Sequence, residues 1–489
     1  MSVRGNKIIS HGRIYLIGNI LQRCVSFVML PIYTRFLTPA DYGTIELLSM
    51  ILDFVGIILG LRIAESIFRF YAEYDDQKDK NEVITTAIYL VFFLNIIGIL
   101  LIYATSGFLT KLIFNDTSQR YNLMLFSLTL LLHVFIEIPM IYIRAKQRPW
   151  IFITFSMLKL ILQLSLNIIF VVVMNLHVLG VIYSAVATSA TMGIILIGFT
   201  IKSCGISFSV AKAKKLISFS LPLILTGIIS FYITFGDRYF LRVYGGLDEV
   251  GIYSLAYKFG FLLTFLIVNP FNAIWDSEKY NIAKVDGNVK KFGDIFIHYT
   301  TLIIFVCIGL TIFVKDVLQI MAAPEFWGAA PIVPVILAAY FTNAMSAYVN
   351  LGILLRNRTI EITYGTVIAG LVITVGYLML IPLYGAMGAA LATMLAFGAR
   401  SVWVYFRAKR LFDMELSWGF VLALILLWLL IYAISHVSYN FPLLLSITWN
   451  SILLLSVLVI LLVTPLLPKH VRNRIKKSLS NPKALLNFR

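Results

Sequence analysis

Nine ionisable residues lie inside long apolar stretches of this sequence, where charged side chains are unusual. They are Arg23, Asp53, Arg62, Glu65, His133, Glu137, Lys159, Lys258 and Arg400. A charge at the centre of a membrane helix costs about 2.5–3.5 kcal/mol on insertion scales. Such residues persist when they face a water-filled cavity or a partner of opposite charge. Each is therefore a candidate functional residue.

Five of these residues are cations suited to an anionic ligand: Arg23, Arg62, Lys159, Lys258 and Arg400. At similar depth they are matched by three carboxylates, those of Asp53, Glu65 and Glu137. A cationic excess in a buried cleft favours phosphate, because arginine presents a planar pair of donors to phosphate oxygens. The structural alternative is that polar residues only hydrogen-bond neighbouring helices to one another.

The candidates for ion coupling are Glu65, His133, Glu137 and Asp237. His133 and Glu137 are four residues apart and so share one helix face. They form either a proton relay, because histidine titrates near neutral pH, or a structural hydrogen-bonded pair. Asp237 and Arg238 end an apolar stretch. They form either an interfacial ion pair or a gating or ion-binding element.

The composition excludes an ordinary soluble protein. The 489 residues are 60% hydrophobic and 13% charged, and the mean hydropathy is +0.91. Soluble domains are roughly 45–50% apolar and about 25% charged. The formal net charge of +17 does not indicate nucleic acid here, because the basic residues lie in short loops beside apolar segments. The three cysteines are far apart and predict neither disulfides nor a metal site.

Hydropathy predicts an all-α, polytopic membrane protein, because about 20 apolar residues suffice for a helix to cross a bilayer. Fourteen segments follow from the apolar runs and their breakers. They are 13–34, 44–69, 83–105, 121–143, 150–174, 178–201, 215–237, 250–275, 294–314, 328–354, 360–382, 386–406, 417–437 and 442–464. The N-terminal run is interpreted as the first transmembrane helix and not as a cleaved signal peptide.

The loop charges predict the orientation. With a cytoplasmic N-terminus, 28 of the 40 Lys and Arg fall on the cytoplasmic side and six on the opposite side. This bias follows the positive-inside rule and requires an even number of helices, with both termini in the cytoplasm. Exported loops are too short for a separate domain, and no P-loop, HExxH or CxxC motif is present. We therefore expect no enzyme, no catalytic residues and no cofactor.

Two stretches repeat a pattern in the two halves of the chain. Aligning Arg35-Phe36-Leu37 with Tyr239-Phe240-Leu241 brings Asp41-Tyr42-Gly43 near Glu249-Val250-Gly251. Each stretch connects the first and second helices of a six-helix half, which predicts parallel repeats. The predicted domains are a first lobe at 1–205, a second lobe at 206–411, two added helices at 412–466 and a basic cytoplasmic tail at 467–489.

The stretches PIYTRFLTPADYGTIEL and GDRYFLRVYGGLDEVGIYSLAYK, with the layout of six, six and two helices, resemble a known family. It is the polysaccharide transporter family of the multidrug, oligosaccharidyl-lipid and polysaccharide exporter superfamily. Its members are O-antigen and capsule repeat-unit flippases, related to lipid II flippases. The resemblance implies two lobes around a cationic lumen and alternating access driven by H⁺ or Na⁺. It implies lumen cations on helices 1, 2 and 8, here Arg23, Arg62 and Lys258.

By the same resemblance, helices 13 and 14 line a groove for a polyprenyl tail. We therefore expect a flippase for polyprenyl-diphosphate-linked oligosaccharides in the bacterial cytoplasmic membrane. Its partners are the lipid-linked glycan, the bilayer, and polysaccharide polymerase and glycosyltransferases, with no nucleic acid. A cation-coupled multidrug exporter of the same superfamily is the alternative, although that function favours carboxylates and twelve helices. A membrane polymerase or ligase would need a long exported catalytic loop.

Overall fold

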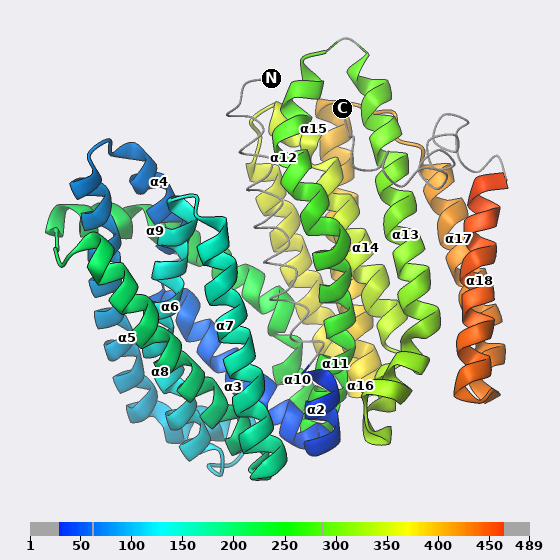
Figure 1. Ribbon diagram of the computed structural model, residues 1–489. Coiled ribbons are helices and arrows are strands. Elements are labelled where there is room, and N and C mark those ends of the chain that lie inside the picture. The colour runs from blue at the N-terminus through cyan, green and yellow to red at the C-terminus, as the bar shows by residue number, and fades with distance from the viewer. Residues whose placement is uncertain (1–28, 61–62, 286, 464–489) are drawn as a thin grey trace. The chain divides into compact units, whose positions relative to one another are not determined.

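The apolar stretches fold into helices, because in lipid each backbone N–H and C=O group must be satisfied within the protein. The computed structural model describes residues 29–60, 63–285 and 287–463, and in these ranges every regular element is a helix (Figure 1). The all-α prediction is confirmed for the part described. Predictions for Arg23, Arg62 and the basic tail at 467–489 lie outside the described residues.

The chain divides into two units, Met1–Ser254 and Leu255–Arg489. The first unit contains α2 (Leu30–Phe36), α3 (Pro39–Leu59), α4 (Ile63–Glu73), α5 (Gln77–Phe114), α6 (Arg120–Ala145), α7 (Pro149–Asn167), η1 (Ile168–Val173), α8 (His177–Cys204), α9 (Val210–Phe235), α10 (Asp237–Tyr244) and the start of α11 (Leu247–Leu263). Here α6 packs between α5 and α8, and α9 packs against α3, α4 and α5. The predicted lobe boundary at 205/206 stays a prediction.

The second unit contains the rest of α11, η2 (Thr264–Val268), α12 (Asn269–Ala283), α13 (Asn288–Met321), η3 (Pro324–Ala329), α14 (Val333–Val349), α15 (Leu351–Leu355), α16 (Ile360–Leu411), α17 (Trp418–Ser435), η4 (His436–Asn440) and α18 (Leu443–Val463). Within this unit α14 packs along α16, and α13 contacts both α17 and α18. Figure 1 shows α17 and α18 running side by side.

Eleven helices in the described ranges are long and apolar enough to cross a membrane. One of them, α16, contains 52 residues, and its helix is broken at Gly385, where φ is 52°. Glycine tolerates this left-handed conformation, so the break separates the predicted segments 360–382 and 386–406. Predicted segment 328–354 corresponds mainly to α14, which has 17 residues. Segment 13–34 lies largely outside the described residues, and the count of fourteen stays a prediction.

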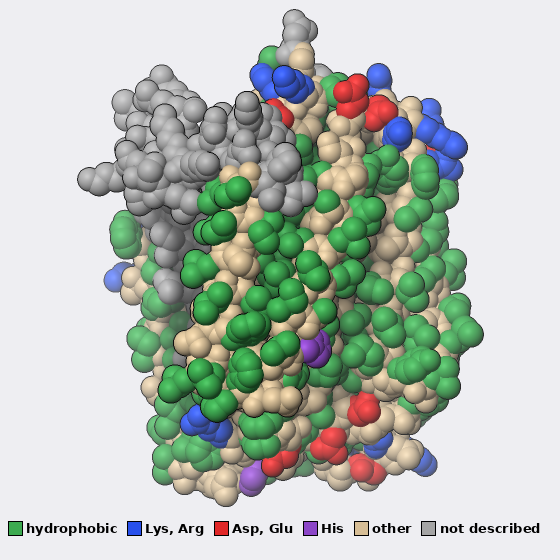
Figure 2. Space-filling view, turned by 90° about the vertical axis from the view of Figure 1, so that its right-hand side faces the viewer, with side chains coloured by type: hydrophobic (Ala, Val, Ile, Leu, Met, Phe, Trp, Pro, Cys, Tyr) green, Lys and Arg blue, Asp and Glu red, His purple; other side chains and the backbone are tan. Residues whose placement is uncertain are grey.

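The surface agrees with a bilayer as the solvent. Figure 2 shows one face on which hydrophobic side chains form a broad belt between charged residues at its upper and lower ends. On α17 and α18, Leu426, Leu430, Ile452 and Leu455 are more than half exposed. A soluble monomer rarely exposes so large an apolar area, whereas lipid acyl chains cover it at no cost. The chain is therefore a multi-pass membrane protein.

The helix pair α17 and α18, which contains no Lys, Arg, Asp or Glu, is held to α13 by buried polar groups. Asn450 Nδ2 donates to Asp316 Oδ2 at 2.7 Å, and Ser446 Oγ donates to Asp316 Oδ1 at 2.5 Å. On α17, Trp428 Nε1 donates to Thr311 Oγ1 at 3.1 Å. Apolar contacts gain little in lipid, so these hydrogen bonds specify where the pair attaches.

The first of the two repeated stretches forms the start of α3. Thr38 Oγ1 accepts from the Asp41 backbone N–H at 3.1 Å, and Asp41 Oδ2 accepts from the Thr38 N–H at 3.2 Å. With Pro39 at the first helical position, this capping box fixes where α3 begins. The sequence Thr-Pro-Ala-Asp is thus a helix-start signal as well as part of the repeated pattern.

The two aligned glycines mark a close approach of two helix starts. A Cβ atom on Gly43 would lie 2.2 Å from the Leu247 carbonyl oxygen, and one on Gly251 would lie 2.0 Å from that of Pro39. No side chain fits in either position, so α3 and α11 pack backbone against backbone there. The repeated stretches therefore contact each other at these glycines.

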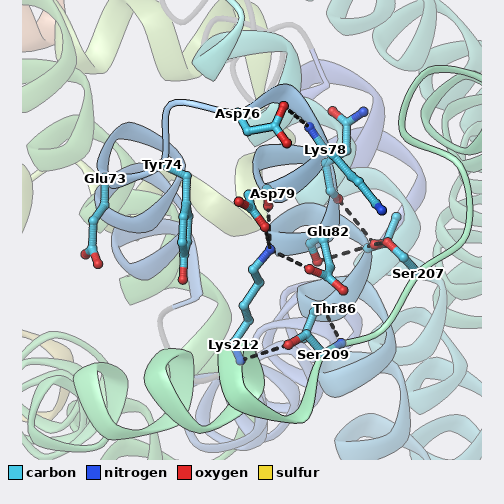
Figure 3. Close-up of polar contacts among 12 residues, drawn as sticks. Glu73, Tyr74, Asp76, Lys78, Asp79, Glu82, Thr86, Ser207, Ser209 and Lys212 are labelled. Carbon is cyan, nitrogen blue, oxygen red and sulfur yellow. Dashed lines mark hydrogen bonds and ion pairs between the residues drawn. The ribbon is translucent and has the colours of Figure 1, made fainter.

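Charged residues attach the start of α9 to the start of α5 (Figure 3). We call this group, formed by Lys212, Asp79 and Glu82, the Lys212 latch. The loop charges predict that this end of α9 faces the cytoplasm. Lys212 Nζ lies 2.8 Å from Asp79 Oδ1 and 2.5 Å from Glu82 Oε2, and its side chain is 8% exposed. Beside it, the Ser209 N–H donates to Thr86 Oγ1 at 3.1 Å. The latch fixes the first turn of α9 to the first turns of α5.

Candidate functional site

An open cavity of about 590 Å³ lies among α3, α4, α5, α6 and α9 of the first unit. At about 30 Å³ each, it has room for about twenty water molecules. Its polar lining residues are Ser49, Asp53, Glu65, Asn95, Thr129, His133 and Glu137. Three carboxylates and a histidine inside a membrane-helix bundle are costly unless water, a solute or a protein partner stabilises them. We call this space the acidic cavity.

Each helix brings its polar groups to the cavity through ordinary helical spacing. Asp53 and Ser49 are four residues apart on α3, so both project from one face. His133 and Glu137 have the same spacing on α6, and Thr129 continues that face one turn earlier. These repeats of four explain why side chains scattered along the sequence gather in one place.

Asn95 shapes the wall between α5 and α6. Its side chain is 4% exposed, and its Nδ2 donates to the Leu130 carbonyl at 3.0 Å. This bond fixes the two helices side by side where they border the cavity. From α9, Phe231 and Phe235 provide an apolar wall, and the Phe231 ring lies 5.7 Å from that of Phe54.

His133 and Glu137 form a pair in the cavity. His133 Nδ1 lies 3.5 Å from Glu137 Oε2, and the two side chains are 53% and 47% exposed. Both side chains are therefore accessible from the cavity. The choice between a proton relay and a structural hydrogen-bonded pair stays a prediction. Lys159, on α7, interacts electrostatically with Glu137. This lysine is the one predicted lumen cation that the described part of the first unit contains.

Within the described ranges, no three His, Cys, Asp or Glu side chains are close enough to hold a metal ion. Asp53, Glu65 and Glu137 bring three acidic side chains to one open space. The cavity therefore gathers acidic side chains inside a bundle of membrane helices.

The other predicted site residues lie elsewhere. Lys258, on α11, is half-buried and belongs to the second unit. Arg400, on α16, also belongs to that unit, and its Nη1 donates to Asn343 Oδ1 at 3.3 Å. Arg23 and Arg62 lie outside the described residues. A cationic lumen shared by these four residues and Lys159 stays a prediction.

Asp237 is buried at the start of α10 and does not line the acidic cavity. Its Oδ1 lies 2.6 Å from Arg238 Nη1, and the Tyr253 hydroxyl donates to Oδ2 at 2.6 Å. Arg238 Nη1 also donates to the Thr234 carbonyl at 2.9 Å. This geometry is an ion pair that connects α9, α10 and α11. A role of Asp237 in gating or ion binding stays a prediction.

Sequence reasoning missed two kinds of residue. Asn95 is a single polar residue in an apolar run, a signal that was available but weaker than a charge. Lys212 was counted only among the basic residues on the predicted cytoplasmic side, and its side chain is in fact buried between two carboxylates. No local signal distinguishes it from Lys214 or Lys215.

A family model described as "Polysaccharide biosynthesis protein" matches residues 11–275, which is more than half of the chain. The chain belongs to this family. The family match covers all five helices that line the acidic cavity. The comparison with curated protein sequences gave no match.

Solved structures show which membrane fold this member of the family has. The chain is similar to the lipid II flippase MurJ in an inward closed conformation, with a TM-score of 0.73 and 14% identity, over 90% of this chain and 97% of that one. It is also similar to an inward-facing MATE family multidrug resistance transporter of the MOP superfamily, with a TM-score of 0.61 and 14% identity, over 80% and 95%. A third similar structure is a Vibrio cholerae MATE transporter, with a TM-score of 0.54 and 14% identity, over 84% of this chain and 98% of that one.

Proposed function

We propose that this protein moves a polyprenyl-diphosphate-linked oligosaccharide repeat unit across the bacterial cytoplasmic membrane by alternating access. The observation that carries the proposal is the match to a family of polysaccharide biosynthesis proteins, joined by the likeness in fold to a lipid II flippase. The acidic cavity offers a place for the coupling ion. We infer that the substrate crosses between the membrane helices. No catalytic step is part of the proposal.

The proposed roles of the residues follow their charges. Arg23, Arg62, Lys159, Lys258 and Arg400 hold the diphosphate, because cations bind phosphate oxygens through charge-assisted hydrogen bonds. Glu65, His133 and Glu137 take up the coupling ion, H⁺ or Na⁺, in the acidic cavity. Asp237 contributes to coupling through its ion pair with Arg238. Asp53 joins the coupling group because it lines the same cavity.

The proposed setting follows from the loop charges. Both termini lie in the cytoplasm, where glycosyltransferases assemble the lipid-linked glycan, and a polymerase receives it on the opposite side. The uncharged pair α17 and α18 contacts the polyprenyl tail. Its exposed leucine and isoleucine side chains offer an apolar surface suited to a long hydrocarbon chain.

A cation-coupled drug exporter is the second candidate, and one observation favours it. The polar lining of the acidic cavity contains three carboxylates and one histidine, which suits a cationic solute. The likeness to MATE transporters agrees with this candidate at the level of the fold. The distinction depends on whether the transported molecule is an anionic lipid or a cationic drug.

A gene deletion distinguishes the two functions. We expect the deletion strain to accumulate a lipid-linked oligosaccharide on the cytoplasmic leaflet, and a plasmid with the wild-type gene to clear it. The Glu137→Gln variant should clear it poorly at normal membrane abundance. A strain that accumulates no lipid-linked glycan but becomes sensitive to cationic drugs would overturn the proposal in favour of the exporter.

A further inference from the structure

A second open cavity, of about 470 Å³, lies on α16 in the second unit and shares no lining residue with the acidic cavity. Ile368, from the first part of α16, lines one side of it. The other lining residues come from the second part of the helix. They are Ala399, Val402, Trp403, Phe406, Arg407 and Arg410. Their spacing of three and four residues places all six on one face of the helix.

This face changes from apolar to basic along its length. From residue 399 to residue 410 the helix rises about 16 Å at 1.5 Å per residue. That distance is close to the thickness of one hydrocarbon leaflet, about 15 Å. Val402 and Phe406 are 56% and 58% exposed, and the two arginines follow at the basic end of the helix. The face therefore has the dimensions and polarity of a single membrane lipid, with acyl chains at one end and a headgroup at the other.

Contacts within the protein fix the basic end of this face of α16. Arg407 Nε lies 3.2 Å from Glu361 Oε2, and the Arg407 guanidinium lies 4.5 Å from the centre of the Trp403 ring. Trp403 Nε1 donates to the Glu361 carbonyl at 3.0 Å. These contacts fix Arg407 against the aromatic ring before any ligand arrives. Arg410 lies one turn further and is exposed.

The charge of the cavity selects the class of ligand. Two arginines beside one glutamate leave a net charge of +1, which matches a single phosphodiester. A zwitterionic lipid brings a second, positive group that the arginines repel, and a diphosphate brings more negative charge than the cavity balances. Basic pockets on the cytoplasmic side of membrane helices commonly hold anionic headgroups.

We propose that this face of α16 binds one anionic glycerophospholipid of the phosphatidylglycerol type, in the leaflet that borders the basic loops. Arg410 and Arg407 bind the phosphodiester, and Val402, Phe406 and Ile368 contact the acyl chains. The site is separate from the acidic cavity and does not depend on the proposed function.

Native mass spectrometry of the purified full-length protein in detergent tests the proposal, with added phosphatidylglycerol and phosphatidylcholine as probes. We expect Arg410→Gln to weaken phosphatidylglycerol binding about fivefold, since one basic residue near anionic lipid contributes about 1 kcal/mol. Lys409→Gln removes the same charge from the same turn, but Lys409 is not a lining residue of the cavity, and its ammonium group lies 6.0 Å from the centre of the Tyr405 ring. This control should change binding less than twofold.

Three results would overturn the proposal. The first is equal binding of phosphatidylglycerol and phosphatidylcholine by the wild-type protein. The second is an equal loss of binding in Arg410→Gln and Lys409→Gln, which would indicate only general attraction to a basic surface. The third is displacement of phosphatidylglycerol by polyprenyl diphosphate at lower concentration, which would assign the site to the transported lipid. The thermal unfolding midpoint of Arg410→Gln should equal that of the wild type and so exclude misfolding.

Discussion

Carboxylates of the first unit occur in two contrasting surroundings. In the Lys212 latch, Asp79 and Glu82 lie 2.8 Å and 2.5 Å from one buried ammonium group. In the acidic cavity, Glu137 lies 3.5 Å from a half-exposed histidine, and Asp53 and Glu65 line the same open space. The latch satisfies its charges within the protein, whereas the cavity leaves room for water or a solute to do so. Carboxylates therefore attach α9 to α5 in the latch, whereas in the cavity they face a space that water or a solute can enter.

The largest expected effect is on stability, at the close contact between α3 and α11. Gly43→Ala places a methyl group 2.2 Å from the Leu247 carbonyl oxygen, so α3 and α11 must separate. We expect the free energy of unfolding to fall by about 3 kcal/mol, the upper end for overpacking. Chemical denaturation in detergent measures it.

Gly198→Ala is the matched control, because its methyl group meets nothing within 4 Å. It should leave stability unchanged or raise it slightly through helix propensity. Equal stability of the two variants would show that the glycine contact is not tightly packed.

The next effect tests whether the latch is structural. Lys212→Met leaves Asp79 and Glu82 without their shared cation. Removing one partner of a fully buried pair costs about 3–5 kcal/mol, and because both carboxylates are partly exposed we expect about 2 kcal/mol. Thermal unfolding should show the loss, while transport per folded molecule stays near the wild-type value.

Lys215→Met is the control for the latch. Lys215 and its partner Glu73 are 49% and 45% exposed, so water screens this ion pair and its loss should leave the stability nearly unchanged. A Lys212→Met protein as stable as Lys215→Met would mean that the latch does not hold α9. A strong loss of transport without loss of stability would mean that the latch takes part in transport. The latch and the acidic cavity would then not differ in role.

Substitutions in the acidic cavity should lower transport and leave stability unchanged. Glu137→Gln keeps the shape of the side chain and removes its exchangeable charge. We expect transport to fall about tenfold, which corresponds to about 1.4 kcal/mol, with unfolding unchanged. Asp75→Asn, an exposed substitution outside the helices, should leave both quantities unchanged. An unfolding midpoint that drops together with transport would place Glu137 among the structural charges.

The smallest expected effect concerns His133. Its contact with Glu137 is open to water, and exposed pairs contribute about 0.2–1 kcal/mol. We expect His133→Asn to lower transport about twofold to threefold, because Glu137 keeps its charge. A pH profile measures whether the histidine tunes proton uptake. An identical profile in wild type and variant would remove His133 from the coupling group.

The sequence was sufficient for the fold and for part of the site. Long apolar stretches and the loop charges predicted the helices, and mid-helix Glu65, His133 and Glu137 proved to line one cavity. The alignment of Gly43 with Gly251 predicted a repeat, although only the folded chain shows that the two stretches touch. Local pattern is enough for such features because helix period and hydropathy act over a few turns.

The local sequence pattern did not predict features that depend on residues distant in the chain. Lys212 resembles any loop lysine until α5 brings two carboxylates to it, 130 and 133 residues away in sequence. The lipid-sized face of α16 needs the break at Gly385, which brings Ile368 beside the second part of the helix. Such sites arise from tertiary packing, which hydropathy does not encode.

Reconstitution into liposomes tests the central claim most directly, namely that the acidic cavity serves the movement of an anionic lipid-linked glycan. The measurement is the rate at which a polyprenyl-diphosphate-linked oligosaccharide reaches the opposite leaflet under an imposed H⁺ or Na⁺ gradient. We predict movement by the wild type and by Lys215→Met, and movement near the level of empty liposomes for the double variant Asp53→Asn with Glu137→Gln. Wild-type liposomes no faster than empty ones, or a double variant as fast as the wild type, would contradict the account.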